Sequence, residues 1–198
     1  MKNARLPFLS LAAVVTALAL SACAVGTSTS STPTASDASS SAPVASAFNS
    51  DDVMFAQVMI PHHKQAVRMT DNLLAKDGVD PMIIDLATQI KAAQAPEITT
   101  MQAWLTDWNA SDDGMAGMDH GTDGMMSGDD MMKLQNASGA DAGALYLKQM
   151  IMHHEGALVM AQTELADGEN ADALALAEAI VSSQTAEITT MNDLLAAR

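Results

Sequence analysis

The sequence predicts an all-α fold, an up-down four-helix bundle built from two duplicated helical hairpins. Aromatic residues make up only 3% of the chain, too few for a typical β-sandwich, whereas Ala, Leu, Met and Gln, which favour helices, dominate. Hydrophobic residues recur at spacings of three and four along four long stretches. The first two of these stretches are repeated, motif for motif, in the last two.

The N-terminus has the features of a secretion signal. Lys2 and Arg5 precede a hydrophobic run over 6–20 that is too short to span a bilayer stably. The run ends in Leu-Ser-Ala-Cys at 20–23, which resembles a bacterial lipobox, and in such signals the Cys becomes the lipid-modified first residue. An ordinary signal peptide cut nearby, with Cys23 incidental, is the alternative. We therefore expect a signal peptide at 1–22 and a mature protein anchored by lipid outside the cytoplasm.

Cysteine usage and charge exclude several classes of function. Cys23 is the only Cys, so its lipidation would leave no disulfide, no Cys-ligated zinc site and no Cys nucleophile. The formal charge is −15, and removing Lys2 and Arg5 with the signal makes the chain more negative still. Such a surface repels nucleic acid and anionic lipid.

A flexible tether is expected at 23–48, because this segment is rich in Ser, Thr, Ala and Pro and has almost nothing to bury. The folded domain is expected at 49–198. Its first helix should run from about Asp51 to Lys76, preceded by capping residues at 49–51 and ended by Asp77-Gly78. A second helix should start at Asp80-Pro81, a cap followed by Pro at the first helical position, and reach about Trp108.

The second hairpin is expected to repeat this pattern. Its helices should span about 141–166, ended by Asp167-Gly168, and about 171–197. Met-Ile-Pro-His-His at 59–63 aligns with Met-Ile-Met-His-His at 150–154, an offset of 91 residues. Gln-Ala-Pro-Glu-Ile-Thr-Thr-Met at 94–101 aligns with Gln-Thr-Ala-Glu-Ile-Thr-Thr-Met at 184–191, an offset of 90. Two such hairpins packed together make a four-helix bundle with pseudo-twofold symmetry.

A Met-rich loop is expected between the hairpins, at about 109–139. Six of the 16 Met residues lie at 112–132 among Gly and Asp, without helical or strand periodicity. We interpret this segment as a mobile loop.

The residues suited to metal binding occupy matching places in the two repeats. On a helix, Met59, His62 and Met69 share one face and His63 lies at its flank. The same spacing relates the corresponding set in the second repeat, which is Met150, His153, His154 and Met160. Packing the hairpins together would bring the two faces toward each other.

The ligand types favour a soft metal. Di-iron sites in helical bundles use Glu-x-x-His, but here Met59 and Met150 stand three residues before the first His of each pair. Thioether and imidazole together select Cu(I) or Ag(I) over Fe, Mn or Mg. The alternative is structural, since Met at helical spacing usually fills a core and a His on a hydrophobic face is usually a satisfied core residue.

The second helix of each hairpin could add ligands or residues that orient them. Glu97 and Glu187 are each followed four residues later by Met, and a buried Glu would need a partner such as His. The alternative is that both Glu residues face solvent. The complete set of these possible contributors is Glu97, Met101, Glu187, Met191 and Met152, the last of which replaces Pro61 in the second repeat.

The Met-rich loop is a second, independent soft-ligand signal. Its candidates for capturing a metal ion are Met115, Met118, His120, Met125 and Met126. The alternative is a low-complexity linker. We favour capture, because exposed Met side chains in a Gly/Asp loop have little use in folding.

The paired motifs and the Met/His loop together resemble the CopM-like family of bacterial proteins, catalogued as domain of unknown function family 305. The resemblance covers roughly 50–197. It implies a ferritin-like four-helix bundle and copper binding and resistance outside the cytoplasm. By their positions in the motifs, it points to the two Met-His-His-Met sets.

The sequence therefore predicts a binding protein rather than an enzyme, since it contains no phosphate loop, dinucleotide-binding turn or Ser nucleophile motif. Its expected cargo is copper, mainly as Cu(I), for sequestration, resistance or transfer to a partner protein. A di-metal redox enzyme on the same bundle and a structural or partner-binding bundle are the alternatives.

Overall fold

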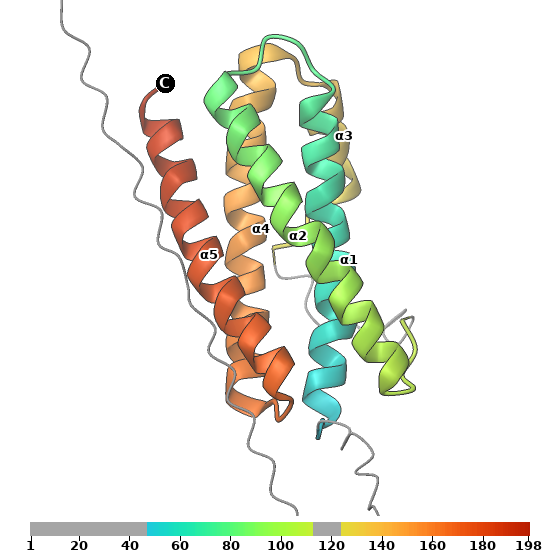
Figure 1. Ribbon diagram of the computed structural model, residues 1–198. Coiled ribbons are helices and arrows are strands. Elements are labelled where there is room, and N and C mark those ends of the chain that lie inside the picture. Colours follow the sequence, from blue (N-terminus) through green and yellow to red (C-terminus); the bar gives the residue numbers. More distant parts are fainter. Residues whose placement is uncertain (1–46, 113–123) are drawn as a thin grey trace, which may run out of the picture. The chain divides into compact units, whose positions relative to one another are not determined.

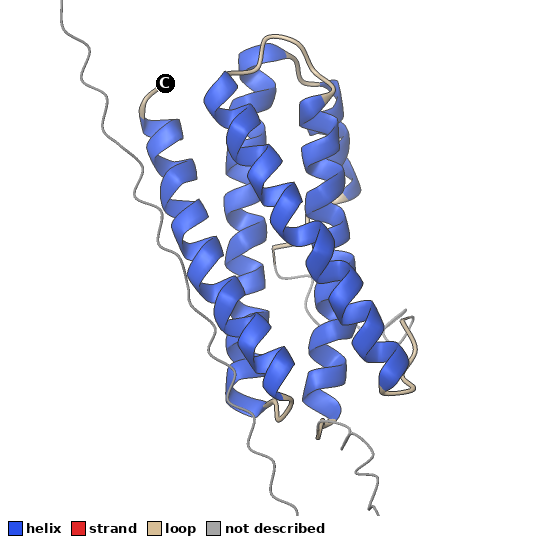
Figure 2. Ribbon diagram, viewed as in Figure 1, coloured by secondary structure: helices blue, strands red, loops and turns tan. Residues whose placement is uncertain are grey.

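The computed structural model describes residues 47–112 and 124–198, and all of their regular structure is helical (Figures 1 and 2). The helices are α1 (Ser50–Leu74), α2 (Pro81–Asp107), α3 (Gly128–Asn136), α4 (Gly139–Asp167) and α5 (Ala171–Ala196). The predicted all-α bundle is confirmed, and the four long helices begin and end within two residues of their predicted bounds. The signal peptide and nearly all of the tether, over 1–46, lie outside the described residues.

Local capping explains where the helices begin. The Asn49 side chain accepts hydrogen bonds from the backbone N–H groups of Asp51 (2.7 Å) and Asp52 (3.1 Å), while Asp52 accepts the N–H of Asn49 in return. At α2, Asp80 accepts the N–H of Met82 at 2.9 Å, and Pro81 occupies the first helical position. These contacts satisfy N–H groups that the first helical turn leaves without intrahelical partners.

The helices form two antiparallel hairpins, α1–α2 and α4–α5, which meet mainly through α1 and α4 (Figure 1). The Asn49 side chain at the start of α1 donates to the carbonyl of Asp167 at the end of α4, at 2.8 Å. At the opposite end, Arg198 after α5 donates to the carbonyl of Ala140 at the start of α4, at 3.0 Å. Therefore α1 and α4 run in opposite directions and α2 and α4 run in the same direction, so the four long helices do not alternate up and down throughout, contrary to the up-down order that the sequence predicted.

The core consists of two hydrophobic clusters, one toward each end of the bundle. One contains Met69, Leu73, Ile83, Leu86, Ile90, Tyr146, Leu147, Met150 and Met191. The other contains Phe55, Met59, Ile60, Met101, Leu105, Ala157, Ala161, Ala177 and Ile180. Along α1 the sequence passes from Met59 in one cluster to Met69 in the other, and the His pair lies between them. Along α4 the order is reversed: Met150 belongs to the cluster with Met69, the second His pair follows, and Met160 packs against the cluster with Met59.

The helix α3 lies inside the segment that was predicted to be a loop, so that prediction is wrong over 128–136. Ser127 caps the helix by accepting the N–H of Asp130 at 3.2 Å, and Leu134 is fully buried against the first cluster. From α4, the Gln149 side chain donates to the carbonyl of Asp130 at 2.9 Å. The helix is thus held by one core side chain and by bonds from its neighbours.

The chain just before α3 is clamped onto α1 and passes close to α4. The Gln65 amide donates to the carbonyl of Met126 at 2.9 Å and accepts its N–H at 2.7 Å. Gly124 has φ +77°, and a Cβ there would meet the carbonyl of Met152 and the backbone of Gly156. Gly156 is the repeat counterpart of Gln65, so the two halves differ where this segment crosses.

Buried polar residues join the start of α1 to the end of α4. Asp52 is fully buried and accepts the backbone N–H groups of Glu169 (3.1 Å) and Asn170 (2.8 Å). Burial alone would raise the pKa of Asp52, but the backbone N–H groups of Asn49, Asn170 and Glu169 hold it below its usual range. Beside it, burial and the carboxylate of Asp52 raise the pKa of Glu164 to about 8.

None of the helices in the described part of the chain is both long and hydrophobic enough to cross a membrane.

Candidate metal centre

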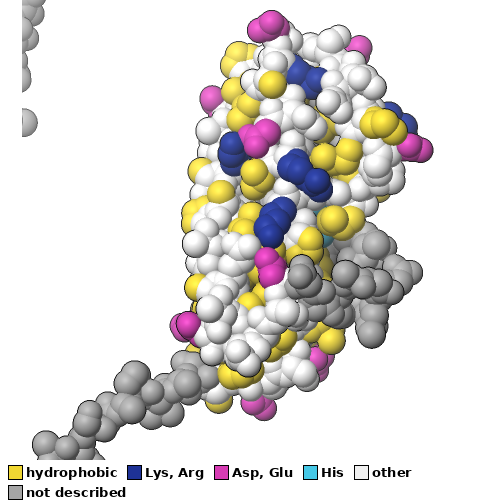
Figure 3. Space-filling view, turned by 90° about the vertical axis from the view of Figure 1, so that its right-hand side faces the viewer, with side chains coloured by type: hydrophobic (Ala, Val, Ile, Leu, Met, Phe, Trp, Pro, Cys, Tyr) yellow, Lys and Arg dark blue, Asp and Glu magenta, His cyan; other side chains and the backbone are white. Residues whose placement is uncertain are grey.

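A polar layer separates the two hydrophobic clusters. Its buried members are His62, His63, Gln94, His153, His154 and Gln184, each at most 3% exposed, and Glu97 and Glu187 border it. One His of each pair, His62 from α1 and His153 from α4, meets the other between the hairpins, so the faces that carry the His pairs lie toward each other as the repeat predicts. On the face shown in Figure 3, acidic, basic and hydrophobic side chains are interspersed and His is almost wholly hidden.

His62 and His153 face each other across the junction between the hairpins. Their ring centroids are 3.6 Å apart with an interplanar angle of 35°. Burial and the neighbouring imidazoles lower the pKa of His153 well below its ordinary value. Neutral imidazole is the form that binds metal ions. The layer therefore holds His153 in a ligand-competent state at neutral pH.

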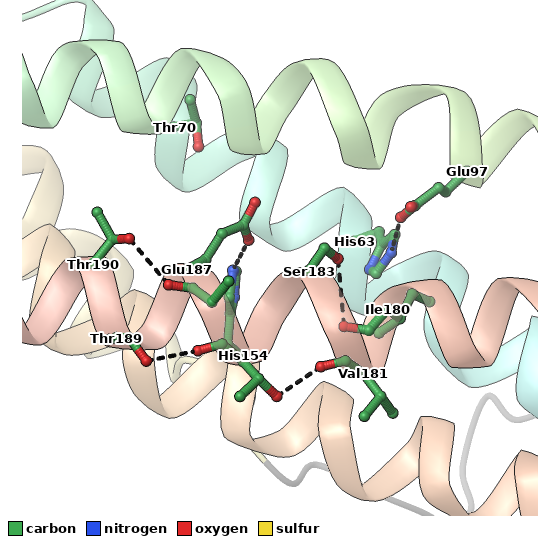
Figure 4. A network of polar contacts seen from close by, with 12 residues as sticks. His63, Thr70, Glu97, His154, Ile180, Val181, Ser183, Glu187, Thr189 and Thr190 are labelled. Atoms are coloured by element: carbon green, nitrogen blue, oxygen red, sulfur yellow. Dashed lines mark hydrogen bonds and ion pairs between the residues drawn. The ribbon is translucent and has the colours of Figure 1, made fainter.

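His63 and His154 each bond to a carboxylate from the outer helix of their own hairpin (Figure 4). The distance from His63 Nε2 to Glu97 Oε2 is 2.8 Å, and from His154 Nε2 to Glu187 Oε2 it is 2.6 Å. A carboxylate only accepts hydrogen bonds, so Nε2 carries the proton and a neutral ring presents its lone pair at Nδ1.

The Nδ1 atoms of His63 and His154 are buried, and neither has a hydrogen-bond partner among residues 47–112 and 124–198. A carboxylate that fixes the tautomer of a His whose other nitrogen is free is the arrangement found behind many metal-ligating His residues. Glu97 and Glu187 thus lie where the sequence predicted possible orienting residues, beside the His pairs.

Gln94 and Gln184 were not predicted as members of the site. Both are 3% exposed, and both have buried amide atoms without partners among the described residues: Oε1 and Nε2 of Gln94 and Oε1 of Gln184. Each lies one helical turn before its Glu. Leaving a buried amide without hydrogen bonds costs about 1–3 kcal/mol. The amides of Gln94 and Gln184 therefore favour binding of water or a hydrated ion within the layer.

The predicted Met ligands border the layer from both sides. Met59 and Met101 are fully buried in one cluster, with partly buried Met160 against it. Met69, Met150 and Met191 are fully buried in the other cluster. These thioethers fill the core, as the structural alternative expects, and Met59 and Met150 lie one helical turn before the first His of each pair. Met152 does not fit the site, because it is 55% exposed on the surface of α4.

The loop candidates fall into two groups. Met115, Met118 and His120 lie outside the described residues. Met125 is partly buried, and Met126 is only 7% exposed and packs in the cluster with Met69. The prediction that Met126 captures metal on a mobile loop is therefore wrong, because its backbone is clamped by Gln65 and its side chain belongs to the core.

In the described part of the chain, no three His, Cys, Asp or Glu side chains are already gathered around one point. A hard ion that demands several oxygen ligands has no preformed cage in these residues. A soft d10 ion has no geometric preference from its d electrons and accepts imidazole and thioether. The donor set of the polar layer and its Met borders fits such an ion best.

A comparison with known protein families gives a match for this bundle. A family profile described as domain of unknown function, DUF305, matches residues 52–195. No curated protein sequence matches the chain.

Several solved structures share the fold. A DUF305 protein from Streptomyces coelicolor is 34% identical, with a TM-score of 0.67 over 74% of this chain and 91% of that one. A DUF305 fragment from Deinococcus radiodurans is 28% identical, with a TM-score of 0.69 over 76% and 98% of the two chains. CopM in its Cu(I)-bound form is 28% identical, with a TM-score of 0.62 over 72% and 94%. CopM has also been solved in Cu(II)-bound and Ag-bound forms.

Proposed function

The chain belongs to the DUF305 family, and from that premise we propose that it binds a soft metal ion, copper above all, in the polar layer. The observation that carries the proposal is the pair of His–Glu contacts, His63–Glu97 and His154–Glu187, which leave two buried Nδ1 atoms facing no other partner in the described residues. Their equivalence in the two repeats gives each hairpin the same binding unit.

The ligand chemistry supports copper or silver over harder ions. Imidazoles lie between Met-containing clusters, so an ion in the layer meets soft nitrogen and sulfur donors. The structural relative CopM, solved with Cu(I), Cu(II) and Ag, supports the same choice. Cu(I) is the favoured cargo, and Ag(I) is the expected substitute.

The role that we propose is sequestration of copper outside the cytoplasm, for resistance or for delivery to a partner protein. The lipobox-like sequence ending at Cys23 would anchor the domain to a membrane through the Ser/Thr-rich tether. We propose a binding protein rather than an enzyme, because the layer gathers imidazoles bordered by thioethers, which are ligands for soft metal ions.

Competition with a Cu(I) chelator tests this proposal. The purified protein is expected to withdraw Cu(I) from the chelator and to leave Zn(II) and Fe(II) largely unbound in parallel titrations. A variant with Ala at His62, His63, His153 and His154 should lose this tight binding while its circular dichroism remains helical. Unchanged Cu(I) affinity in that variant would exclude the polar layer as the site.

The same titrations discriminate between the alternatives. The di-metal enzyme is favoured only by the two carboxylates at the layer, Glu97 and Glu187, and it predicts Fe(II) uptake with an oxygen-dependent absorbance change. A purely structural bundle predicts no response to any of these metals.

A further inference from the structure

Building on the proposed metal site, we propose that metal ions reach and leave the polar layer through a groove between α2 and α5, past Glu187, and that Met82 is the first soft ligand they meet there. The groove has a volume of about 410 Å³. Its lining from α2 is Met82, Asp85, Leu86 and Gln89, and its lining from α5 is Ala186, Glu187, Thr190 and Leu194.

Glu187 belongs both to this groove and to the polar layer. Its carboxylate contacts Nε2 of His154 at 2.6 Å, and the His154 side chain has no exposed surface. The Glu187 side chain itself is 20% exposed. Figure 4 shows it reaching from α5 toward His154. A rotation of this one side chain would therefore connect the buried imidazole with the groove.

The groove walls have the chemistry of a passage for a soft cation. Met82 is 65% exposed, more than any other large hydrophobic side chain of the described residues. Its thioether is a Cu(I) and Ag(I) ligand. Asp85 and Glu187 supply negative charge without any basic residue in the lining, so cations are favoured along the whole groove.

The internal repeat explains why the route lies beside Glu187 and not at the equivalent positions beside Glu97. The counterpart of Leu194 in the first hairpin is Trp104, which stacks on Trp108 with ring centroids 5.8 Å apart. Trp108 in turn stacks on Phe48 at 5.0 Å. The counterpart of Met82 is Asp172. The His63–Glu97 side thus carries bulky stacked rings and no thioether at the positions that line the groove on the other side.

Exchange kinetics test the route with a control supplied by the repeat. Thr190→Trp places a large ring in the groove, whereas Thr100→Trp makes the same change at the equivalent position of the first hairpin, and both Thr residues are exposed. Cu(I) transfer from the loaded protein to a chelator is followed by stopped flow. Thr190→Trp should slow transfer by about tenfold or more at unchanged equilibrium affinity, and Thr100→Trp should not.

A second pair of variants tests the role of Met82 in the groove. Its result does not depend on how the protein packs the introduced Trp side chain. Met82→Leu should slow Cu(I) uptake, whereas Met54→Leu, which alters another exposed Met outside the groove, should not. Equal exchange rates within both pairs would overturn the route while leaving the metal site intact. Failure of the unaltered protein to bind Cu(I) or Ag(I) would overturn the site and the route together.

Discussion

At the scale of single residues, the decisive feature is that two of the buried imidazoles, His63 and His154, each have Nε2 bonded to a carboxylate and Nδ1 without a partner among the described residues. The carboxylates of Glu97 and Glu187 hold Nε2 of His63 and His154. Both carboxylates keep about a fifth of their side-chain surface exposed, so they remain solvated while the rings do not. This division lets a carboxylate orient its ring without a charge being fully buried.

Glu97→Gln should weaken Cu(I) binding by about 10–100-fold, because the amide can present its N–H to the ring and no longer fixes the tautomer that exposes Nδ1. Chelator competition measures the change. Thermal unfolding of the metal-free variant is the control and should stay close to that of the unaltered protein. An affinity equal to that of the unaltered protein would mean that Glu97 does not act through His63.

Glu164 gives a prediction of pH dependence. Burial and the Asp52 carboxylate raise its pKa from 4.5 to about 8, so the folded state favours the protonated form. Its contribution to stability is therefore complete below pH 4.5 and is lost as the pH rises through 8, with a slope of at most about 1.4 kcal/mol per pH unit. The lowered pKa of Asp52 acts in the opposite sense, but only in more acidic solution.

Glu164→Gln removes that titration. The free energy of unfolding of the variant, relative to that of the unaltered protein, should rise between pH 5 and pH 8. Urea denaturation at the two pH values measures it, and because both proteins contain the same His residues, His titration cancels in the difference. A difference that is constant over this range would contradict the account of the Asp52–Glu164 pair.

At the scale of elements, local signals predicted the long helices and missed the short one. Asn49, Asp80 and Pro81 mark helix starts by contacts within a few residues, so the sequence alone revealed them. The helix α3 depends on distant partners: the burial of Leu134 against the core and the bonds from Gln65 and Gln149. No periodicity in a Gly- and Asp-rich segment announces such contacts.

The candidate site was partly predictable for the same reason. Duplication revealed the His pairs, the Glu residues and most of the Met residues. Gln94 and Gln184 were missed because Gln on a helix is mostly exposed. A signal was present, since Gln94 continues the buried stripe of Ala87 and Ile90 at spacings of three and four and leads to Met101.

Leu134→Ala should destabilise the fold by about 2–3 kcal/mol, because Leu134 is fully buried and its removal leaves a cavity beneath α3. Chemical denaturation measures the loss. Met132→Ala is the control on the same helix, since Met132 is 53% exposed, and its effect should stay within about 0.5 kcal/mol. Equal effects of the two changes would mean that α3 does not pack on the core.

At the scale of the whole molecule, the polar layer lies at the junction of two equivalent hairpins. His62 and His153 come from different hairpins, so an ion held between them would tie the halves together. Binding to the folded state alone stabilises a protein by mass action, by about 4 kcal/mol when free ligand reaches about 1,000 times Kd.

Silver should therefore raise the unfolding temperature by roughly 10 °C at such an excess, given typical unfolding entropies for chains of this length. Differential scanning calorimetry with and without Ag(I) measures the shift, and Ag(I) avoids the need to exclude oxygen. The variant with Ala at all four His residues of the layer is the control and should show no shift. A similar shift in that variant would place silver elsewhere in the chain.

The most direct test of the central claim is X-ray absorption spectroscopy at the copper edge, on protein loaded with one equivalent of Cu(I). We predict imidazole scattering in the unaltered protein, joined by sulfur at a distance typical of thioether, and loss of the imidazole signal when His62, His63, His153 and His154 are all Ala. A spectrum with sulfur ligands alone, unchanged by those substitutions, would contradict the claim that the polar layer is the metal site.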